Sequence, residues 1–336
     1  ANSPDSKALT ASEVASLSAS GLNRSSDRAA SPGSRDEASF ERVLAADEAT
    51  QRAKLLRSSG RLREALAEFE RAVDLNPGAV DAHLGIGDIY KDEGDLSSAE
   101  EAYARASAAG PEIFEAQYAH GLVLQLMGRH GEAIRRYLRA LAIDPRQFEA
   151  NMNTGLAFVQ IGRPDQGLPY AQRAVQLQPS SGPAHYNLGV CLASLNRHRE
   201  AIGSFRRASE SMGLSPQLLL ALADSHAATG EHDEATRTLE RLIRREPSAS
   251  AFRRLGTAHF RTRQYDASLE AFRTAIDYDD RHYPAYNGVA VCLLNTYLWS
   301  NKTNLTALED AIDALRASLR IRRDQPEIIE LLTRFG

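Results

Sequence analysis

The chain has 336 residues, of which 40 are basic and 44 acidic, and its formal net charge is −4. The charges are dispersed, so no basic block indicates a nucleic acid or a membrane surface as a partner. No apolar run approaches the roughly 18 residues of a membrane-spanning helix, so we expect no membrane span.

The first segment, residues 1–34, is rich in Ser and Ala and poor in large apolar side chains. It cannot bury enough surface to offset the entropy lost on ordering, so we expect it to be disordered. Within it, residues 8–22 carry apolar residues next to a capping box formed by Thr10 and Glu13. We interpret this island either as a fluctuating helix or as a segment that docks on the chain's own binding surface.

From residue 46 onward, one pattern recurs every 34 residues. Its clearest copy, residues 114–147, predicts two short amphipathic helices joined by a turn at Gly128 and closed by Pro145. Each first helix carries a small residue where helices cross, and four second helices carry Ala followed four residues later by an aromatic. The small residues are Ala53, Gly87, Gly121, Gly155, Gly189, Ala223, Gly256 and Ala290, and the pairs are Ala65–Phe69, Ala99–Tyr103, Ala133–Tyr137 and Ala201–Phe205.

This pattern, with its period of 34 and its closing prolines, resembles the tetratricopeptide repeat. The resemblance implies an all-α, right-handed superhelical solenoid of about eight repeats, each in contact with its neighbours only. We expect the solenoid to span residues 35–325, with a capping helix at 326–336. The expected repeats are 46–79, 80–113, 114–147, 148–181, 182–215, 216–248, 249–282 and 283–325, the last with an insertion at 295–306.

Three places depart from the pattern. A capping box at Ser34 predicts that the first helix is extended at its N-terminal end. In the fourth repeat, Pro164, Gly167 and Pro169 crowd the second helix and Ala171 replaces the aromatic. We expect this helix to start late and to form a weak joint. In the last repeat, the insertion predicts two lengthened helices.

No catalytic constellation is evident in the sequence, which has no metal-binding His pair, phosphate-binding loop or nucleophile elbow. His130, His198 and His232 share a place after the turn, but helices in adjacent repeats lie about 10 Å apart, too far for one shared zinc ion. We therefore expect packing roles for them, and neither a metal nor another cofactor. Cys191 and Cys292 lie three repeats apart and are expected to be separate buried thiols.

The compartment is left open by the sequence. Two unpaired thiols favour a reducing, cytoplasmic environment, and the abundance of Ala and Arg favours a bacterial source. Because the chain starts at Ala1 rather than Met, a removed signal peptide would instead place the protein in the periplasm or outside the cell.

The resemblance implies that positions 5, 9 and 12 of each first helix line a concave face. One end of this face is then charged, the middle is apolar, and the seventh repeat contributes Arg253, Thr257 and Phe260. Two residues at position 6 are similar to the asparagine ladder of O-linked GlcNAc transferase. The candidate binding residues are Lys54, Arg57, Lys91, Tyr118, Leu122, Met152, Leu156, Tyr186 and Val190, with Asn153 and Asn187 as the asparagines.

Apolar side chains in a concavity usually indicate a ligand that covers them. The sequence therefore predicts a non-enzymatic adaptor that binds a partner protein or peptide in this groove, with the basic residues steering an acidic flank. Some members of the family clamp acidic tails with Lys, Asn and Arg in three successive repeats, and this pattern is absent here. Three alternatives stay open: burial of the strip by tight coiling, assembly contacts through the convex face and ends, and a regulatory arm of a separate enzyme.

Overall fold

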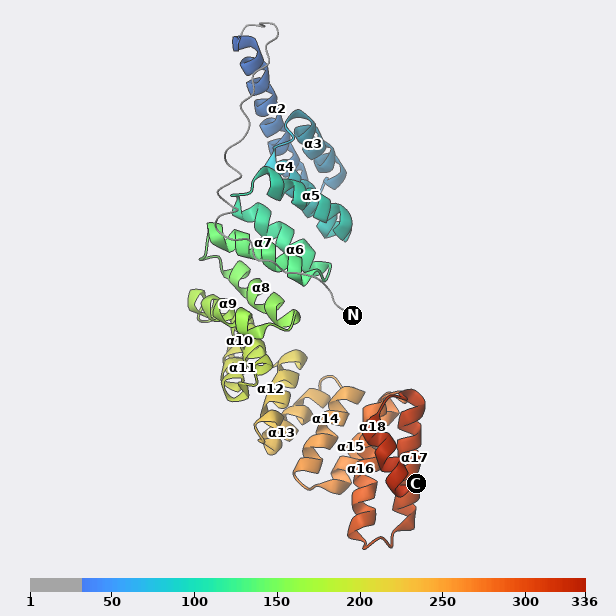
Figure 1. The fold of residues 1–336 in the computed structure, drawn as a ribbon. Coiled ribbons are helices and arrows are strands. Elements are labelled where there is room, and N and C mark those ends of the chain that lie inside the picture. Colours follow the sequence, from blue (N-terminus) through green and yellow to red (C-terminus); the bar gives the residue numbers. More distant parts are fainter. Residues whose placement is uncertain (1–31) are drawn as a thin grey trace, which may run out of the picture.

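The computed structural model describes residues 32–336, and all regular structure in this part of the chain is helical. Seventeen helices follow one another along residues 32–336 (Figure 1). They are α2 (Pro32–Ser58), α3 (Leu62–Leu75), α4 (Val80–Glu93), α5 (Leu96–Ala109), α6 (Phe114–Leu126), α7 (His130–Ile143), α8 (Phe148–Gln160), α9 (Pro164–Leu177), α10 (Gly182–Ser194), α11 (His198–Met212), α12 (Pro216–Ala228), α13 (His232–Ile243), α14 (Ala249–Arg261), α15 (Tyr265–Tyr278), α16 (Tyr283–Trp299), α17 (Leu305–Ile321) and α18 (Pro326–Phe335). The predicted all-α helical solenoid is confirmed.

The N-terminal expectations fall almost entirely outside the described residues. The island at residues 8–22 lies there, as does the segment 1–31. Residues 32–34, which were expected to be disordered, instead form the start of α2. Proline is well tolerated in the first turn of a helix, because the N–H that it lacks has no partner there. Pro32 is therefore compatible with a helix that begins earlier than the capping box predicts.

The helices pair into hairpins whose turns depend on one residue with a left-handed backbone. Gly128, between α6 and α7, has φ 74°, and glycines hold the same place in most other turns. Asn196 (φ 58°) and Arg263 (φ 62°) take this place in the fifth and seventh repeats. Asparagine tolerates this conformation, whereas it is strained for arginine.

The helices of a hairpin approach closely because a glycine on the first helix faces an aromatic ring on the second. A Cβ atom on Gly121 would lie 2.7 Å from the ring of Tyr137, and one on Gly189 would lie 2.5 Å from the ring of Phe205. Both rings are almost completely buried. The recurring small and aromatic residues of the sequence are therefore the two sides of one contact, repeated along the solenoid.

The fourth repeat was expected to have a late-starting second helix, and this expectation is wrong. α9 begins at Pro164 and has 14 residues, as α5 and α7 do. Pro164 occupies the first turn, where proline is favoured. Because Ala171 takes the place of the packing aromatic, the two backbones approach directly, and a Cβ on Gly167 would lie 2.6 Å from the carbonyl oxygen of Gly155. The small residues therefore produce a tight joint.

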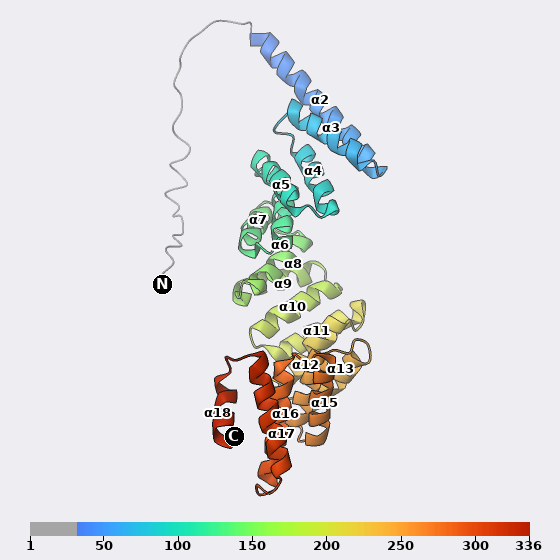
Figure 2. The same cartoon turned by 90° about the vertical axis from the view of Figure 1, so that its right-hand side faces the viewer.

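The hairpins stack into a curved array with the first helices on its inner side (Figures 1 and 2). Successive first helices lie against one another along this side: α2 contacts α4, α4 contacts α6, α8 contacts α10, α10 contacts α12, and α14 contacts α16. Side chains also join α6 to α8 and α12 to α14. The face formed by the first helices is therefore the concave one. No helix within residues 32–336 is both long and apolar enough to cross a bilayer.

Both ends of the array differ from its middle. α2 has 27 residues and extends beyond α3, leaving Phe40 65% exposed (Figure 2). α16 and α17 have 17 residues each, so the predicted insertion lengthens both helices. α18 then covers the last hairpin through Ile328 and neighbouring apolar residues.

Candidate functional site

Six apolar side chains from three successive first helices form what we call the central strip of the concave face. They are Tyr118 and Leu122 on α6, Met152 and Leu156 on α8, and Tyr186 and Val190 on α10. All six keep part of their surface accessible, whereas their neighbours Val123 and Leu124 are buried. Tyr118, Tyr186 and Val190 also pack against core residues. Coiling therefore buries the strip only in part.

Tyr118 is held by contacts with three residues. Its ring stacks on Phe114 with centroids 5.6 Å apart and lies 5.8 Å from the ring of Tyr137. Its hydroxyl oxygen accepts a hydrogen bond of 3.0 Å from Nδ2 of Asn153, in the next repeat. Burial and the nearby carboxylate of Glu149 raise the pKa of Tyr118, so its hydroxyl stays protonated at neutral pH. The ring is thus fixed before any ligand arrives.

The second tyrosine of the strip is less constrained. Tyr186 packs against Phe205 with centroids 5.8 Å apart. Asn187, which occupies the position equivalent to Asn153, makes no side-chain hydrogen bond with another residue of the described part of the chain. The two asparagines therefore do not form a continuous ladder, and only Asn153 joins successive repeats.

The basic residues at the N-terminal end of the concave face are paired with aspartates of α4, in the second repeat. Nζ of Lys54 lies 2.6 Å from Oδ2 of Asp81. Asp88 accepts hydrogen bonds from Arg57 (2.7 Å), Lys91 (3.2 Å) and the Tyr103 hydroxyl (2.6 Å). Burial alone would raise the pKa of the Asp88 carboxyl, but these partners outweigh burial and hold the pKa below its usual value. Charge at this end is therefore balanced within the chain.

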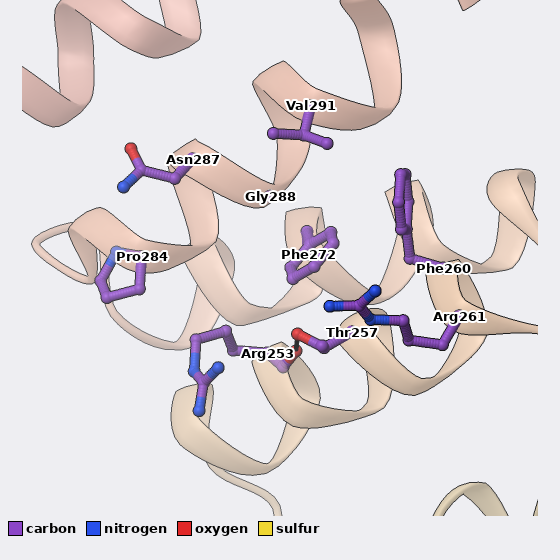
Figure 3. A pocket seen from close by; sticks show the side chains of 9 residues that line it. All are labelled: Arg253, Thr257, Phe260, Arg261, Phe272, Pro284, Asn287, Gly288 and Val291. Atoms are coloured by element: carbon purple, nitrogen blue, oxygen red, sulfur yellow. Dashed lines mark hydrogen bonds between the residues drawn. The ribbon is translucent and has the colours of Figure 1, made fainter. Parts of the chain in front are cut away.

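A pocket of about 340 Å³ opens on the concave face between α14 and α16, and we call it the C-terminal pocket. Figure 3 shows Phe272 of α15 at its centre and Val291 of α16 across from it. The guanidinium of Arg261 is directed back toward Phe272, while that of Arg253 points away from it. The residues that line it are Arg253, Thr257, Phe260, Arg261, Phe272, Pro284, Asn287, Gly288 and Val291.

The sequence pattern predicts Arg253, Thr257 and Phe260 on the concave face, but it does not indicate Arg261 or Phe272 as pocket residues. Arg261 follows Thr257 by one helical turn, so the spacing of four residues could have found it. Phe272 is the aromatic that packs against Gly256 in its own hairpin, and no sequence signal indicates that it also lines a pocket.

One buried contact brings together the residue types of a hydrolase triad. Oγ of Ser107 lies 2.9 Å from Nδ1 of His120, and Nε2 of His120 lies 3.4 Å from Oε1 of Glu100. Ser107 and His120 are each only 3% exposed, and Oγ of Ser107 also lies 3.0 Å from the carbonyl oxygen of Ala104. A substrate has no access to this hydroxyl, so we interpret the contact as packing between repeats.

The remaining candidates for chemistry are packed inside the solenoid. No group of three or more His, Cys, Asp or Glu side chains within residues 32–336 is placed to hold a metal ion. Cys191 and Cys292 are separate buried thiols, as predicted. Sγ of Cys191 donates to the carbonyl oxygen of Pro164 at 3.1 Å, and burial raises the pKa of this thiol to about 11. Such a thiol is a poor nucleophile at neutral pH.

Comparison with known proteins identifies the repeat. The model of the tetratricopeptide repeat family matches the chain six times, and together the matches cover most of it. The matched residues are 50–113, 87–147, 118–182, 152–215, 220–279 and 253–326. One curated relative, Protein bimA of Emericella nidulans, is 32% identical over 77 residues. That match covers 23% of this chain and 10% of the relative.

Solved structures show the same fold. A chain in the crystal structure of the APC/C hetero-tetramer Cut9-Hcn1 aligns with a TM-score of 0.55 and 18% identity, over 81% of this chain and 52% of that one. The pilF protein of Pseudomonas aeruginosa aligns with a TM-score of 0.52 and 21% identity, over 63% of this chain and 96% of that one. PilW, described as a type IV pilus biogenesis factor, aligns with a TM-score of 0.52 and 23% identity, over 63% and 97% of the two chains. At these identities the likeness shows a shared fold alone.

Proposed function

The chain belongs to the tetratricopeptide repeat family, and we propose that it is a protein-interaction scaffold that holds a segment of a partner protein on the central strip. The extended concave surfaces of such solenoids are suited to binding other proteins. We further propose that the chain catalyses no reaction itself, since the triad-like contact of Ser107, His120 and Glu100 within residues 32–336 is closed to substrates.

The observation that carries this proposal is the partial exposure of six apolar side chains on three adjacent helices. Apolar groups gathered in a concavity are favourable binding surface, because a ligand that covers them removes them from water. Tyr118 is already fixed by Phe114, Tyr137 and Asn153, so little side-chain entropy is lost when a ligand packs on it. An apolar, extended or helical segment fits such a surface.

Site-specific photo-crosslinking tests the proposal. A benzophenone amino acid is placed at Leu122 or at Leu156, and the cross-linked protein is identified by mass spectrometry. We expect a shared partner for both positions, and loss of that partner when Tyr118→Ala is combined with Tyr186→Ala. A buried aromatic anchor typically contributes about 2 kcal/mol or more to binding, so removal of two should abolish capture.

The matched control is Tyr170→Ala with Tyr278→Ala, which removes two tyrosines from the second helices α9 and α15. Circular dichroism should show the same helix content for both double variants. If the central-strip variant still captures the partner at the level of the unmodified protein, the central strip is not the binding site. A catalytic subunit among the cross-linked proteins would instead support the regulatory-arm interpretation.

A second candidate surface lies on the convex side. A pocket of about 430 Å³ between α7 and α9 is lined mainly by apolar groups, among them Leu138, Leu141, Pro169 and Tyr170. This pocket favours a contact through the convex face, in which case the control variant, and not the central-strip variant, should lose the partner.

The chain's own residues 8–22 are a competing occupant of the central strip. Because they are tethered to the solenoid, their effective concentration at the strip would be high. If they occupy it, deleting residues 1–31 should strengthen partner capture, and adding the free 8–22 peptide should weaken it again.

A further inference from the structure

Arg253 and Arg261 lie on one face of α14, and each of them lines two pockets. Arg253 and Arg261 are eight residues apart, with Thr257 midway, so the three side chains share a helical face. All three line the C-terminal pocket, and all three also line a second pocket of about 260 Å³ between α12 and α14. Two guanidinium groups therefore line both pockets of the concave face at repeats six to eight.

The positive charge here is not balanced as it is at the other end of the chain. Within the described residues neither Arg253 nor Arg261 forms an ion pair, whereas Arg254 pairs with Asp224 at 2.7 Å. Asp224 is the only acidic residue that lines either pocket. The two pockets together are lined by Arg253, Arg254, Arg261 and Asp224, so their formal net charge from arginine and aspartate is +2. Burial and the neighbouring Arg254 lower the pKa of Arg253, although the carboxylate of Asp224 acts in the opposite sense.

Aromatic side chains stand beside these charges. Phe260 and Phe272 line the C-terminal pocket, and Val291, which is 39% exposed, lies across from them on α16. Phe260 contacts Tyr265 edge to face with centroids 5.3 Å apart, and Tyr265 contacts Trp299 with centroids 4.6 Å apart. The pocket is thus connected through Tyr265 to the single tryptophan, which is 64% exposed at the end of α16.

We propose that the C-terminal pocket binds an acidic segment of the partner protein, with Asp or Glu carboxylates on Arg253 and Arg261 and an aromatic or large aliphatic side chain between Phe260 and Val291. A planar guanidinium matches the geometry of a carboxylate and is less strongly hydrated than an ammonium group, so it suits a partly buried ion pair. The proposal rests on the proposed function and adds to it the chemistry of the partner.

The charge pattern favours this occupant over an apolar segment. An uncharged ligand would bury Arg253 and Arg261 without a counter-ion, and burial of unpaired charge is costly. A carboxylate removes that cost, while the apolar walls accept a neighbouring side chain. The acidic end of such a segment would then lie at repeats six to eight, and its apolar part would extend toward the central strip.

Binding of a defined peptide to the full chain tests the inference. The probe is Gly-Glu-Asp-Phe-Glu-Leu-Asp-Gly with fluorescein at its N-terminus and an amidated C-terminus, followed by anisotropy and by emission of Trp299. Two matched probes replace Glu and Asp by Gln and Asn, or Phe and Leu by Ser. We expect binding of the first probe to be weakened about tenfold or more by either replacement, and to fall as salt is raised.

Protein variants locate the site. Arg253→Gln with Arg261→Gln should weaken binding of the acidic probe about tenfold or more, whereas Arg241→Gln with Arg273→Gln on the second helices should leave it within about twofold. The emission of Trp299 should change on binding to the control variant but not on addition to the Arg253/Arg261 variant.

Three results would overturn the inference: no measurable binding of the acidic probe, equal binding of the uncharged probe, or equal binding by the Arg253/Arg261 variant. Tighter binding of an oligothymidine with the same arginine dependence would assign the pocket to a nucleic acid instead. Failure here is distinguishable from failure of the proposed function, because the cross-linking test depends on Tyr118 and Tyr186 and not on the arginines.

Discussion

Nδ2 of Asn153 donates a hydrogen bond of 3.0 Å to the hydroxyl oxygen of Tyr118, and this bond joins the third repeat to the fourth across the concave face. The two residues lie at equivalent faces of α6 and α8, so the bond fixes both the ring and the offset between successive first helices. Asn187 occupies the same position one repeat later without such a partner among the described residues, and it provides a matched comparison.

We expect Asn153→Ala to loosen Tyr118 and to lower stability by about 0.5–1.5 kcal/mol, the usual net contribution of one hydrogen bond. Hydrogen exchange in α6 and α8 should accelerate, and partner capture should weaken. Asn187→Ala removes the equivalent amide, which makes no such hydrogen bond, so it should change neither hydrogen exchange nor partner capture. Equal effects of the two substitutions would show that the bond to Tyr118 does not order the strip.

The tight helix crossing in the third repeat gives a second prediction. Leucine at Gly121 would drive its side chain into the ring of Tyr137, which is fully buried and cannot move aside. Overpacking of this kind costs about 1–3 kcal/mol, so Gly121→Leu should lower the thermal midpoint by several degrees. Gly131→Leu is the control, since no atom lies within 4 Å of a Cβ there. An unchanged midpoint for Gly121→Leu would contradict the observed crossing.

The third prediction concerns the fourth repeat. Its prolines suggest a weak joint, whereas the structure indicates a tightly packed one. Alanine at Gly167 would meet the carbonyl oxygen of Gly155 at 2.6 Å, and a backbone atom cannot rotate away as a side chain can. Gly167→Ala should therefore destabilise the chain by about 1–3 kcal/mol, despite the better helix propensity of alanine. Gly203→Ala, on α11 with open space around it, should stabilise by about 0.5–1 kcal/mol. Urea unfolding of both variants measures these changes in the free energy of unfolding. If Gly167→Ala leaves that free energy unchanged, α8 and α9 are not tightly packed at this position.

The fold could be predicted from the sequence because one contact repeats. The glycine at 121 and the tyrosine at 137 recur at a fixed period, and a local helical hairpin follows from local residues. The fourth repeat could not be predicted in the same way. The prolines suggest disruption, and only the three-dimensional approach of Gly155 and Gly167 shows how the missing aromatic is accommodated.

The charges of the candidate site were harder to predict than its apolar part. Lys54 and Arg57 look available in the sequence, but their partners Asp81 and Asp88 come from the following repeat, 27 and 31 residues away. Arg253 and Arg261 look no different from them, yet no acidic side chain of the described neighbouring repeats reaches either one. Whether a surface charge is free depends on the rotation between repeats, which the period alone does not give.

The last prediction concerns pH and His120. Burial and the charge of Arg136 lower the pKa of His120, although Glu100 acts in the opposite sense. The unfolded chain has a histidine pKa of about 6.5, so below that pH the unfolded state binds a proton that the folded state does not yet accept. Stability that depends on neutral His120 is therefore complete above about pH 6.5 and is lost as pH falls toward the lowered folded pKa.

Replacing His120 by asparagine removes this dependence while keeping a polar group near Ser107. We expect His120→Asn to be less stable than the unmodified chain at pH 8, because it disturbs the contacts with Ser107 and Glu100. The difference between the two proteins should shrink as pH falls from about 7 to 5, since in that range only the unmodified chain gains a proton at position 120 on unfolding. His282, whose pKa is also lowered by burial, is present in both and cancels from the difference. A difference that stays constant with pH in urea unfolding would show that His120 titrates equally in the folded and unfolded states.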